Sequence, residues 1–342
     1  MPSFPARLSA GAVRACRAPA VRRGALRVAA ARGRALVLLY HRVTPAGASP
    51  ADVVPVVSTA RFRAQLEALA AAGDVVPLAA LDEPADTRRR PRFALTFDDD
   101  EPAHVEHALP VLRALGLPAT FFLMGRALHG LGPPWWVLLE REIARRGLRA
   151  TADALGVAAG TPGELAAACE GTLLAERVAR AFAPGEGASL LSAADVRALA
   201  AAGMEVGFHT LHHLVLTGLS AADARAALHD GRAALAAAAG AAVERVSYPH
   251  GCVDARVAAL ARDVGYQAAY RTGGRPVATP VGARADRWSL GRWEPGPLVP
   301  DTLVAHAAFR LTLPAGAPRR SSLPASGARA AGATRRATSP PR

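Results

Sequence analysis

Three consecutive aspartates, Asp98, Asp99 and Asp100, directly follow the apolar run FALTF at residues 93–97. An isolated run of this kind is commonly a solvated turn whose acids cap the helix that follows. Here the carboxylates stand at the end of what reads as a buried strand, where their mutual repulsion is unfavourable. A divalent cation would offset that repulsion, so the aspartates are candidates for metal binding and for acid–base catalysis.

Histidines with metal-binding spacing occur in GFHTLHHLVLTGLS, residues 207–220. His209 and His213 are four residues apart, a spacing that lets two imidazoles converge on one ion. Taken alone, such a pair is more often a set of surface or core histidines that cap a loop. Together with one aspartate, the pair forms a triad that leaves coordination positions open for water and substrate, while a second aspartate is available as general base. The two segments together predict a hydrolytic metal site.

Alternating strands and helices are predicted along the chain, and they would bring these two segments together. Helices are expected at residues 58–73, 105–116, 191–203, 220–240 and 254–265, each ending in a glycine that suits a left-handed cap. Strands are expected at residues 35–41, 74–78, 93–97, 119–124, 204–208, 243–249 and 266–271. Repeated β–α units indicate an α/β protein, and about seven strands in one run favour a distorted (β/α) barrel. Both candidate segments follow strands and would lie at the same rim of such a barrel.

Residues 126–190 interrupt this alternation and predict a helical insertion at the rim of the barrel. The insertion contains PPWWVLLEREIARRG and a later amphipathic segment. We expect Trp135 and Trp136 to pack within the insertion, although carbohydrate-binding sites also present such aromatic residues.

The net charge of +13 is confined to the two ends of the chain. Residues 1–34 carry eight Arg and residues 315–342 carry six, with no acidic residue in either segment. The remaining arginines nearly balance the 28 acidic residues, so the middle of the chain has no basic surplus for a nucleic-acid-binding surface. The Ala-, Arg-, Pro- and Ser-rich ends predict disorder. We therefore expect one domain over residues 35–313 between disordered tails at 1–34 and 314–342, and no specific nucleic-acid partner.

The cysteines and apolar runs exclude other classes of protein. Cys16, Cys169 and Cys252 are odd in number and widely separated, so they predict neither a disulfide framework nor a CxxC metal site. No apolar run reaches 18 residues, and no transmembrane helix is expected. The Arg-rich N-terminus resembles an organelle transit peptide, but a cytoplasmic protein is the simpler expectation.

Three short motifs together resemble those of the polysaccharide deacetylase family, the NodB homology domain of carbohydrate esterase family four. They are TFDDD at 96–100, HTLHH at 209–213 and SYPHG at 247–251. The phrases LSAADVRALAAAGMEVGFHT and YPHGCVDARVAALARDVGYQAAYRT are also similar to that family, and the likeness extends roughly over residues 35–310. The resemblance implies the barrel fold and a metal-dependent carbohydrate deacetylase.

The resemblance also implies roles for individual residues. Asp98 would be the catalytic base, and Asp99, His209 and His213 would be the metal ligands. The backbone N–H of His250, in SYPHG, would stabilise the oxyanion of the tetrahedral intermediate.

The general acid of the family, usually a histidine in a late LxH motif, is expected near the N-terminus of this chain. LLYHRV at 38–43 resembles that motif as it occurs in permuted members that begin with a YH motif, and it makes His41 the candidate. His306, in LVAH near the C-terminus, is the alternative, but its surroundings look helical. His212 falls at a variable position of its motif and is expected to have no role.

Two positions depart from the usual motifs. Asp100 stands where the family has a small glycine, and it adds negative charge beside the expected ion. Ser247 stands where many members have an arginine that orients the base. Neither change removes a ligand, so we expect both to affect the pKa of the base and the range of substrates.

The sequence therefore predicts hydrolysis of an N-acetyl or other N-acyl group on an amino sugar in a polysaccharide, oligosaccharide or glycoconjugate. The divalent metal is expected to be zinc, with cobalt or nickel as alternatives. The competing hypothesis is a catalytically silent glycan-binding or scaffold protein that retains the deacetylase fold. The expected partner is the carbohydrate substrate, and the sequence leaves the sugar, the acyl group and the oligomeric state open.

Overall fold

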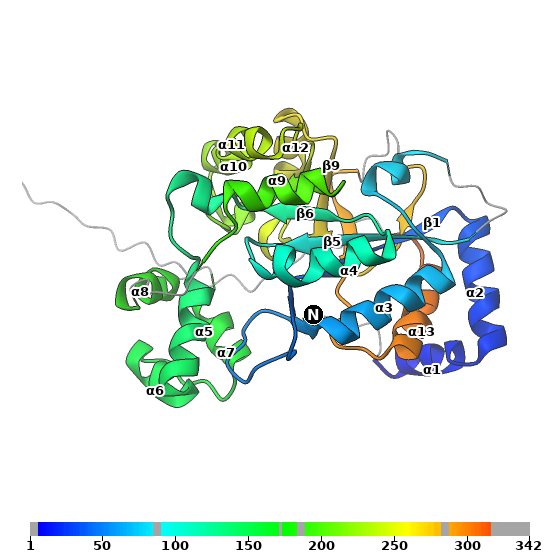
Figure 1. The fold of residues 1–342 in the computed structure, drawn as a ribbon, viewed down its shortest axis with the longest axis horizontal. Coiled ribbons are helices and arrows are strands. Elements are labelled where there is room, and N and C mark those ends of the chain that lie inside the picture. The colour runs from blue at the N-terminus through cyan, green and yellow to red at the C-terminus, as the bar shows by residue number, and fades with distance from the viewer. Residues whose placement is uncertain (1–5, 85–89, 171–172, 183–188, 282–286, 316–342) are drawn as a thin grey trace, which may run out of the picture.

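Parallel strands form a closed barrel at the centre of the molecule (Figure 1). The structure is a computed structural model that describes residues 6–84, 90–170, 173–182, 189–281 and 287–315. Around the ring the strands are β1 (Arg34–Tyr40), β11 (Leu290–Trp293), β9 (Ala268–Thr272), β8 (Arg245–Ser247), β7 (Glu205–Phe208), β6 (Thr120–Leu123) and β5 (Arg92–Asp98), and β5 pairs with β1 to close it. The predicted distorted (β/α) barrel of about seven strands is confirmed.

Shorter elements flank the barrel. β4 (Asp74–Val75) pairs with β5, β10 (Val277–Ala278) runs antiparallel to β1, and β2 (Arg42–Thr44) pairs with β3 (Val56–Ser58). Short 3₁₀ or π turns lie at Leu78–Asp82, His104–Ala108, Arg126–His129, Leu216–Gly218 and Pro249–Gly251. The strand expected at 74–78 is thus confined to β4, and β11 was not predicted.

Alternating side chains of the strands divide the core into two layers. In β1, Ala35 and Val37 pack inside the barrel, whereas Leu36 and Leu38 pack with the apolar faces of the surrounding helices. Because β5 follows the same alternation, Asp98 at its end lies on the inner face. The covering helices are α3 (Thr59–Ala72), α4 (Leu109–Leu115), α9 (Ala193–Ala201), α10 (Ala221–His229), α11 (Arg232–Ala239), α12 (Ala255–Asp263) and α13 (Pro300–Thr312).

The predicted glycine caps are present after four helices, whereas Gly73 has another role. Positive φ angles follow the helices at Gly116, Gly203, Gly240 and Gly265, as predicted. Gly73 is instead extended, with φ of −162°, and a Cβ atom there would lie 2.4 Å from the carbonyl oxygen of Pro91. The chain just before β5 lies too close to residue 73 for any side chain there, so this position requires glycine. The single helix expected at 220–240 is two helices, because Gly231 between α10 and α11 adopts φ of 94°.

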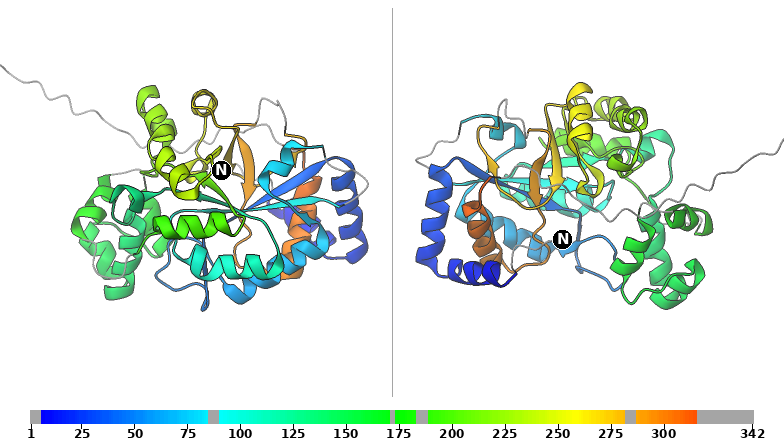
Figure 2. Two further views of the ribbon diagram at one scale, coloured as in Figure 1. Left: turned by 45° about the horizontal axis from the view of Figure 1, so that its top comes forward. Right: turned by 180° about the vertical axis from the view of Figure 1, so that it is seen from behind.

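The N-terminal segment contradicts the disordered tail expected at 1–34. Its described part forms α1 (Ala6–Cys16) and α2 (Pro19–Ala31), which pack beside α13 (Figures 1 and 2). Val13, Cys16, Leu26 and Ala29 are buried in the main core. The physical reason is that Ala, Leu and Arg are strong helix formers, so this low-complexity composition also suits packed helices. In the tail expected at 314–342, residues 316–342 lie outside the described residues.

The predicted helical insertion is confirmed as a separate cluster on one side of the barrel, at the end of the molecule away from α1 and α2 (Figure 2). Its helices are α5 (Trp135–Arg146), α6 (Leu148–Leu155), α7 (Pro162–Cys169) and α8 (Leu173–Ala181). They share an apolar core that includes Leu139, Leu155 and Leu165.

Within the described ranges, no helix is long and apolar enough to cross a membrane.

Candidate active site

The predicted functional side chains meet at the rim formed by the carboxyl ends of the strands. β1 ends just before His41, β5 ends at Asp98, and β7 ends just before His209. Loops at this rim carry the active sites of (β/α) barrels. One pocket of about 380 Å³ is lined by all six predicted site residues, His41, Asp98, Asp99, His209, His213 and His250.

Asp99, His209 and His213 are arranged as three ligands of one ion. Oδ1 of Asp99 lies 3.7 Å from Nε2 of His209 and 3.8 Å from Nε2 of His213. Ligand atoms of all three side chains lie within 4.8 Å of one another. Two donors that are each about 2.1 Å from a zinc ion are separated by less than about 4.2 Å, so the distances from Asp99 allow a shared ion.

The pKa values of both imidazoles are lowered, which favours the neutral form that coordinates a metal. Nδ1 of His209 donates a hydrogen bond to the carbonyl oxygen of Ser247 at 2.9 Å, and the unprotonated Nε2 faces Asp99. Burial lowers the pKa of His209 to about 4, although Asp98 opposes the shift. Burial, and then the neighbouring His250, hold the pKa of His213 well below its usual value.

The surroundings of Asp99 favour a bound cation. Its side chain is buried, and Oδ1 has no hydrogen-bond partner among the described residues. Burial raises its pKa to about 8; the charge of His41 opposes this shift, and the charges of Asp98, Glu101 and Asp100 add to it. A divalent ion would stabilise the ionised carboxylate, so this donor set fits the metal that the sequence predicts.

Backbone strain is concentrated at the same rim. Among the described residues, the non-glycine residues with positive φ are Asp99 (75°), Thr210 (60°), His213 (52°) and His250 (58°). Such conformations are unfavourable and persist where the surrounding structure enforces them, commonly at functional sites. All but Thr210 line the metal pocket, which ties the strain to the site.

Asp98 is held by an arginine that sequence reasoning missed. Arg292, in β11, donates from Nη1 to Oδ1 and from Nη2 to Oδ2, both at 2.6 Å. The hydroxyl of Ser247 donates to Oδ2 at 3.2 Å, so Arg292 supplies the guanidinium that is absent from position 247. Burial opposes ionisation, but Arg292 and then His209 hold the pKa of Asp98 below its usual value. The ionised Oδ2 lies 3.6 Å from Nε2 of His209, beside the triad.

His41 is paired with Glu294, a second residue that the sequence did not reveal. Nδ1 of His41 lies 2.8 Å from Oε1 of Glu294, which directly follows β11. Burial would lower the pKa of His41, but Glu294 and the two aspartates raise it to about 9. The alternative acid, His306, stacks on Trp293 with ring centroids 6.1 Å apart and lines a different pocket. Of the two candidates, only His41 lies beside the triad.

Asp100 stabilises the rim through backbone hydrogen bonds. Its buried carboxylate accepts from the N–H groups that follow β6, at 2.8–3.1 Å, in Met124, Gly125 and Arg126. Asp100 therefore fixes the loop that leads into the insertion, and its charge also contributes to the raised pKa of Asp99. His212 is exposed and does not line the metal pocket.

His250 connects the insertion to a predicted ligand. Its imidazole pairs with Glu170, directly after α7, and its ring packs against His213 with centroids 4.4 Å apart. The predicted oxyanion donor is the backbone N–H of this residue, and that role stays a prediction.

A second cavity, of about 460 Å³, adjoins the metal pocket and shares Asp99 and Trp136 with it. Trp136, which was expected to pack within the insertion, is buried with its ring centroid 4.6 Å from that of His213. Helix α5 therefore forms a wall between the two spaces. The shared wall makes the second cavity a candidate subsite for the rest of a substrate.

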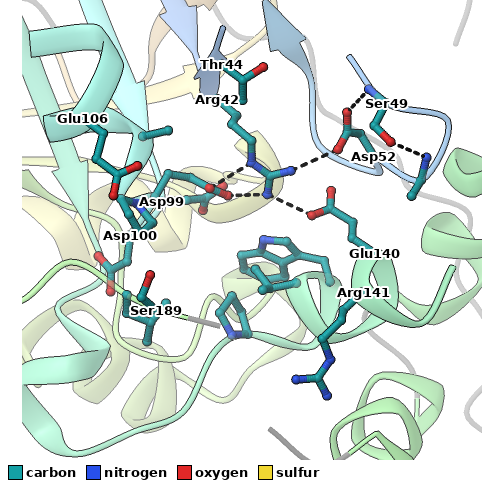
Figure 3. A pocket seen from close by; sticks show the side chains of 18 of the residues that line it. Arg42, Thr44, Ser49, Asp52, Asp99, Asp100, Glu106, Glu140, Arg141 and Ser189 are labelled. Carbon is teal, nitrogen blue, oxygen red and sulfur yellow. Dashed lines mark hydrogen bonds and ion pairs between the residues drawn. The ribbon is translucent and has the colours of Figure 1, made fainter. Parts of the chain in front are cut away.

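Arg42 joins this wall to the aspartate segment. It reaches across the second cavity toward Asp52 and Glu140 (Figure 3). Its guanidinium donates to both carboxylate oxygens of Glu101, at 2.7 and 2.9 Å, and lies 2.9 Å from Oε2 of Glu140. Glu140 also accepts from the backbone N–H groups of the chain at 53–54, at 2.8 and 3.1 Å.

A family model described as polysaccharide deacetylase matches residues 85–269, which is more than half of the chain. The matched range includes the aspartate motif, both histidine ligands and SYPHG. The chain therefore belongs to the polysaccharide deacetylase family.

Solved structures of deacetylases share its fold. The deacetylase PplD of Streptococcus pyogenes, in complex with acetate, is 17% identical with a TM-score of 0.55, over 79% of this chain and 96% of that chain. A polysaccharide deacetylase from Bacillus cereus is 17% identical with a TM-score of 0.54, over 81% and 69% of the two chains. IcaB from Ammonifex degensii is 22% identical with a TM-score of 0.52, over 82% and 97%. The comparison with curated proteins found no match.

Proposed function

We propose that the chain is a metal-dependent N-deacetylase that removes an N-acetyl or related N-acyl group from an amino sugar of a glycan. Family membership supports carbohydrate deacetylation as the class of reaction. The observation that carries the proposal is the meeting of Asp99, His209 and His213 with the ionised Asp98 in one pocket. An ion held by the three ligands, with zinc the best match to the donor set, would supply Lewis-acid chemistry that activates water and polarises the acyl carbonyl.

The remaining residues have complementary roles in this proposal. Asp98 would accept the proton of the attacking water, since Arg292 orients the carboxylate and keeps it ionised. His41, paired with Glu294, would donate a proton to the departing amine nitrogen. The backbone N–H of His250 would donate a hydrogen bond to the developing oxyanion. The products would be the carboxylate of the acyl group and the free amino sugar.

No feature of the site favours the silent glycan-binding alternative. A protein that has lost catalysis needs neither a complete ligand set nor an ionised base beside it. Here the residues proposed as ligands, base and acid line one pocket, and the adjoining cavity of about 460 Å³ would provide space for a neighbouring sugar.

Acetate release tests the proposal directly. The purified chain, loaded with zinc, is incubated with N-acetylglucosamine oligosaccharides and with nucleotide- or lipid-linked N-acetylated amino sugars, and the acetate formed is measured enzymatically. We expect release from at least one of these substrates, and release that is roughly 10²–10⁴-fold slower from a zinc-loaded Asp98→Asn variant. Binding of glycans without any acetate release would instead support the silent alternative.

A further inference from the structure

A basic pocket of about 680 Å³ lies between α1 and α13, which occupy the opposite end of the molecule from the insertion (Figures 1 and 2). Its polar lining consists of Arg14, Arg17, His306 and Arg310. Apolar side chains, including Phe309, complete the wall, and no acidic residue lines the pocket in the described part of the chain. The active-site proposal uses none of these residues.

Arg310 is partly desolvated without a counter-charge. Its Nη1 donates to the carbonyl oxygen of Gly274 at 2.8 Å, and its guanidinium lies 4.7 Å from the centroid of the Trp293 ring. Its Nε is buried and has no hydrogen-bond partner among the described residues. Burial lowers the pKa of Arg310 to about 10. Because withdrawing a guanidinium from water is unfavourable without an anionic partner, this arrangement suits an anionic ligand.

The neighbouring cations increase the positive potential of the pocket. Arg14 and Arg17 form no ion pair with an acidic side chain within the described ranges, and Arg17 makes only a 3.4 Å contact with the hydroxyl of Thr302. After burial, the charges of Arg310 and Arg17 lower the pKa of His306. By contrast, Arg22 on the adjacent helix is paired with Asp301. Positive charge is thus concentrated here without neutralisation by the described chain.

We propose that this pocket binds the phosphate group of a phosphate ester. Guanidinium groups bind phosphate oxygens with paired, charge-assisted hydrogen bonds, and Arg14, Arg17 and Arg310 line one space. The apolar wall at Val13 and Phe309 would contact the organic part of the ester. A soluble phosphate ester and the headgroup of an anionic phospholipid present this same chemistry.

The test uses the full chain and two double variants with the same change of charge. Arg14→Glu/Arg17→Glu alters the pocket, whereas Arg23→Glu/Arg27→Glu alters exposed positions of α2 outside it. Binding of inorganic phosphate and of glycerol 1-phosphate is measured by calorimetry at fixed ionic strength. Cosedimentation with phosphatidylcholine vesicles, with and without phosphatidic acid, is measured in parallel. Melting temperatures without ligand verify folding, and Arg14→Gln/Arg17→Gln is a milder pocket variant.

We expect phosphate affinity to fall at least about tenfold in both pocket variants and less than about twofold in the α2 variant, because hydrogen bonds to charged groups are strong. Cosedimentation with acidic vesicles that only the pocket variants lose would identify a lipid headgroup as the source. Binding of the soluble phosphates without cosedimentation would identify a soluble ester. The proposal is overturned if the unaltered chain binds neither phosphate nor acidic vesicles. Equal weakening of pocket and control variants, or undiminished binding by the pocket variants, would overturn it as well.

Discussion

Two adjacent aspartates have different environments in this protein, and the difference follows from their neighbours. Burial disfavours the charged form of both Asp98 and Asp99. The guanidinium of Arg292 reverses that effect at Asp98, whereas acidic neighbours reinforce it at Asp99. The surroundings therefore favour the ionised form of Asp98, which the proposed base needs, and at Asp99 they favour binding of a cation.

Substitution of these two aspartates separates the proposed base from the proposed ligand. Asp98→Asn should retain bound metal and lose roughly 10²–10⁴-fold in turnover, the usual contribution of a positioned base. Asp99→Asn should lose both turnover and metal, because one of three ligands is weakened. Metal content by atomic emission and acetate release measure the two effects. The reverse pattern would exchange the two assignments.

The pair of His41 and Glu294 predicts a pH effect. Glu294 raises the pKa of His41, so a general acid at this position loses its proton, and the reaction its rate, only at alkaline pH. Glu294→Gln should lower that pKa and move the alkaline limb of the pH–rate profile to lower pH. His41→Ala should reduce turnover roughly 10²–10⁴-fold with metal retained. His306→Ala is the control and should leave turnover nearly unchanged; an active His41→Ala enzyme would contradict the assignment.

Motif spacing predicted the residues of the site that follow long apolar runs, but it missed the partners that tune them. Asp98, Asp99 and His209 directly follow strands that the sequence marks clearly. Arg292 lies in β11 and Glu294 directly follows it; this strand has four residues, and its apolar pattern is too short to recognise. Their places depend on the pairing of β11 with β1, a long-range contact that no local pattern specifies.

At the scale of elements, helix α5 is part of the active-site wall. Glu140 on α5 pairs with Arg42, one residue after the proposed acid, and accepts hydrogen bonds from Val53 and Val54, which line the metal pocket. Trp136 on the same helix packs against His213. The insertion therefore supports the site from outside the barrel.

Removal of Glu140 should loosen that wall. Glu140→Ala leaves two backbone N–H groups without their acceptor and removes one of the carboxylates that pair with the half-buried Arg42. It should reduce the free energy of unfolding by about 2–4 kcal/mol. The KM for glycans should rise while metal content is retained. Urea denaturation and steady-state kinetics measure the effects. The control is Glu176→Ala, which removes an exposed ion pair with Arg180 on α8 and should change neither quantity. Equal effects of the two variants would contradict a supporting role for α5.

Helices could be predicted from the sequence where a local signal, such as a glycine cap, marks the end of the helix. Glycines in the left-handed conformation end helices such as α4 and α11, where the chain reverses, and a glycine after an apolar helical pattern predicts such an end from sequence alone. Composition was misleading for α1 and α2, because alanine- and arginine-rich segments suit both disorder and packed helices. Burial of Val13 and Leu26 in the main core decides in favour of packed helices over disorder. This burial depends on α13, which is distant in the sequence.

At the scale of the whole molecule, closure of the barrel assembles the site from both ends of the chain. β1 pairs with β5 on one side and with β11 on the other. His41 thereby lies beside Glu294 and in the same pocket as Asp98 and His213. A closed ring of parallel strands collects their carboxyl ends at one rim, whatever the position of each strand in the sequence.

The most direct test of the account is the metal content of the purified chain, measured together with acetate release before and after chelation. We predict about one divalent ion per chain, loss of ion and activity together on chelation, recovery of both with zinc, and neither in a His209→Ala/His213→Ala variant. A chelated, metal-free chain that still released acetate would contradict the account, as would a double variant that retained the ion.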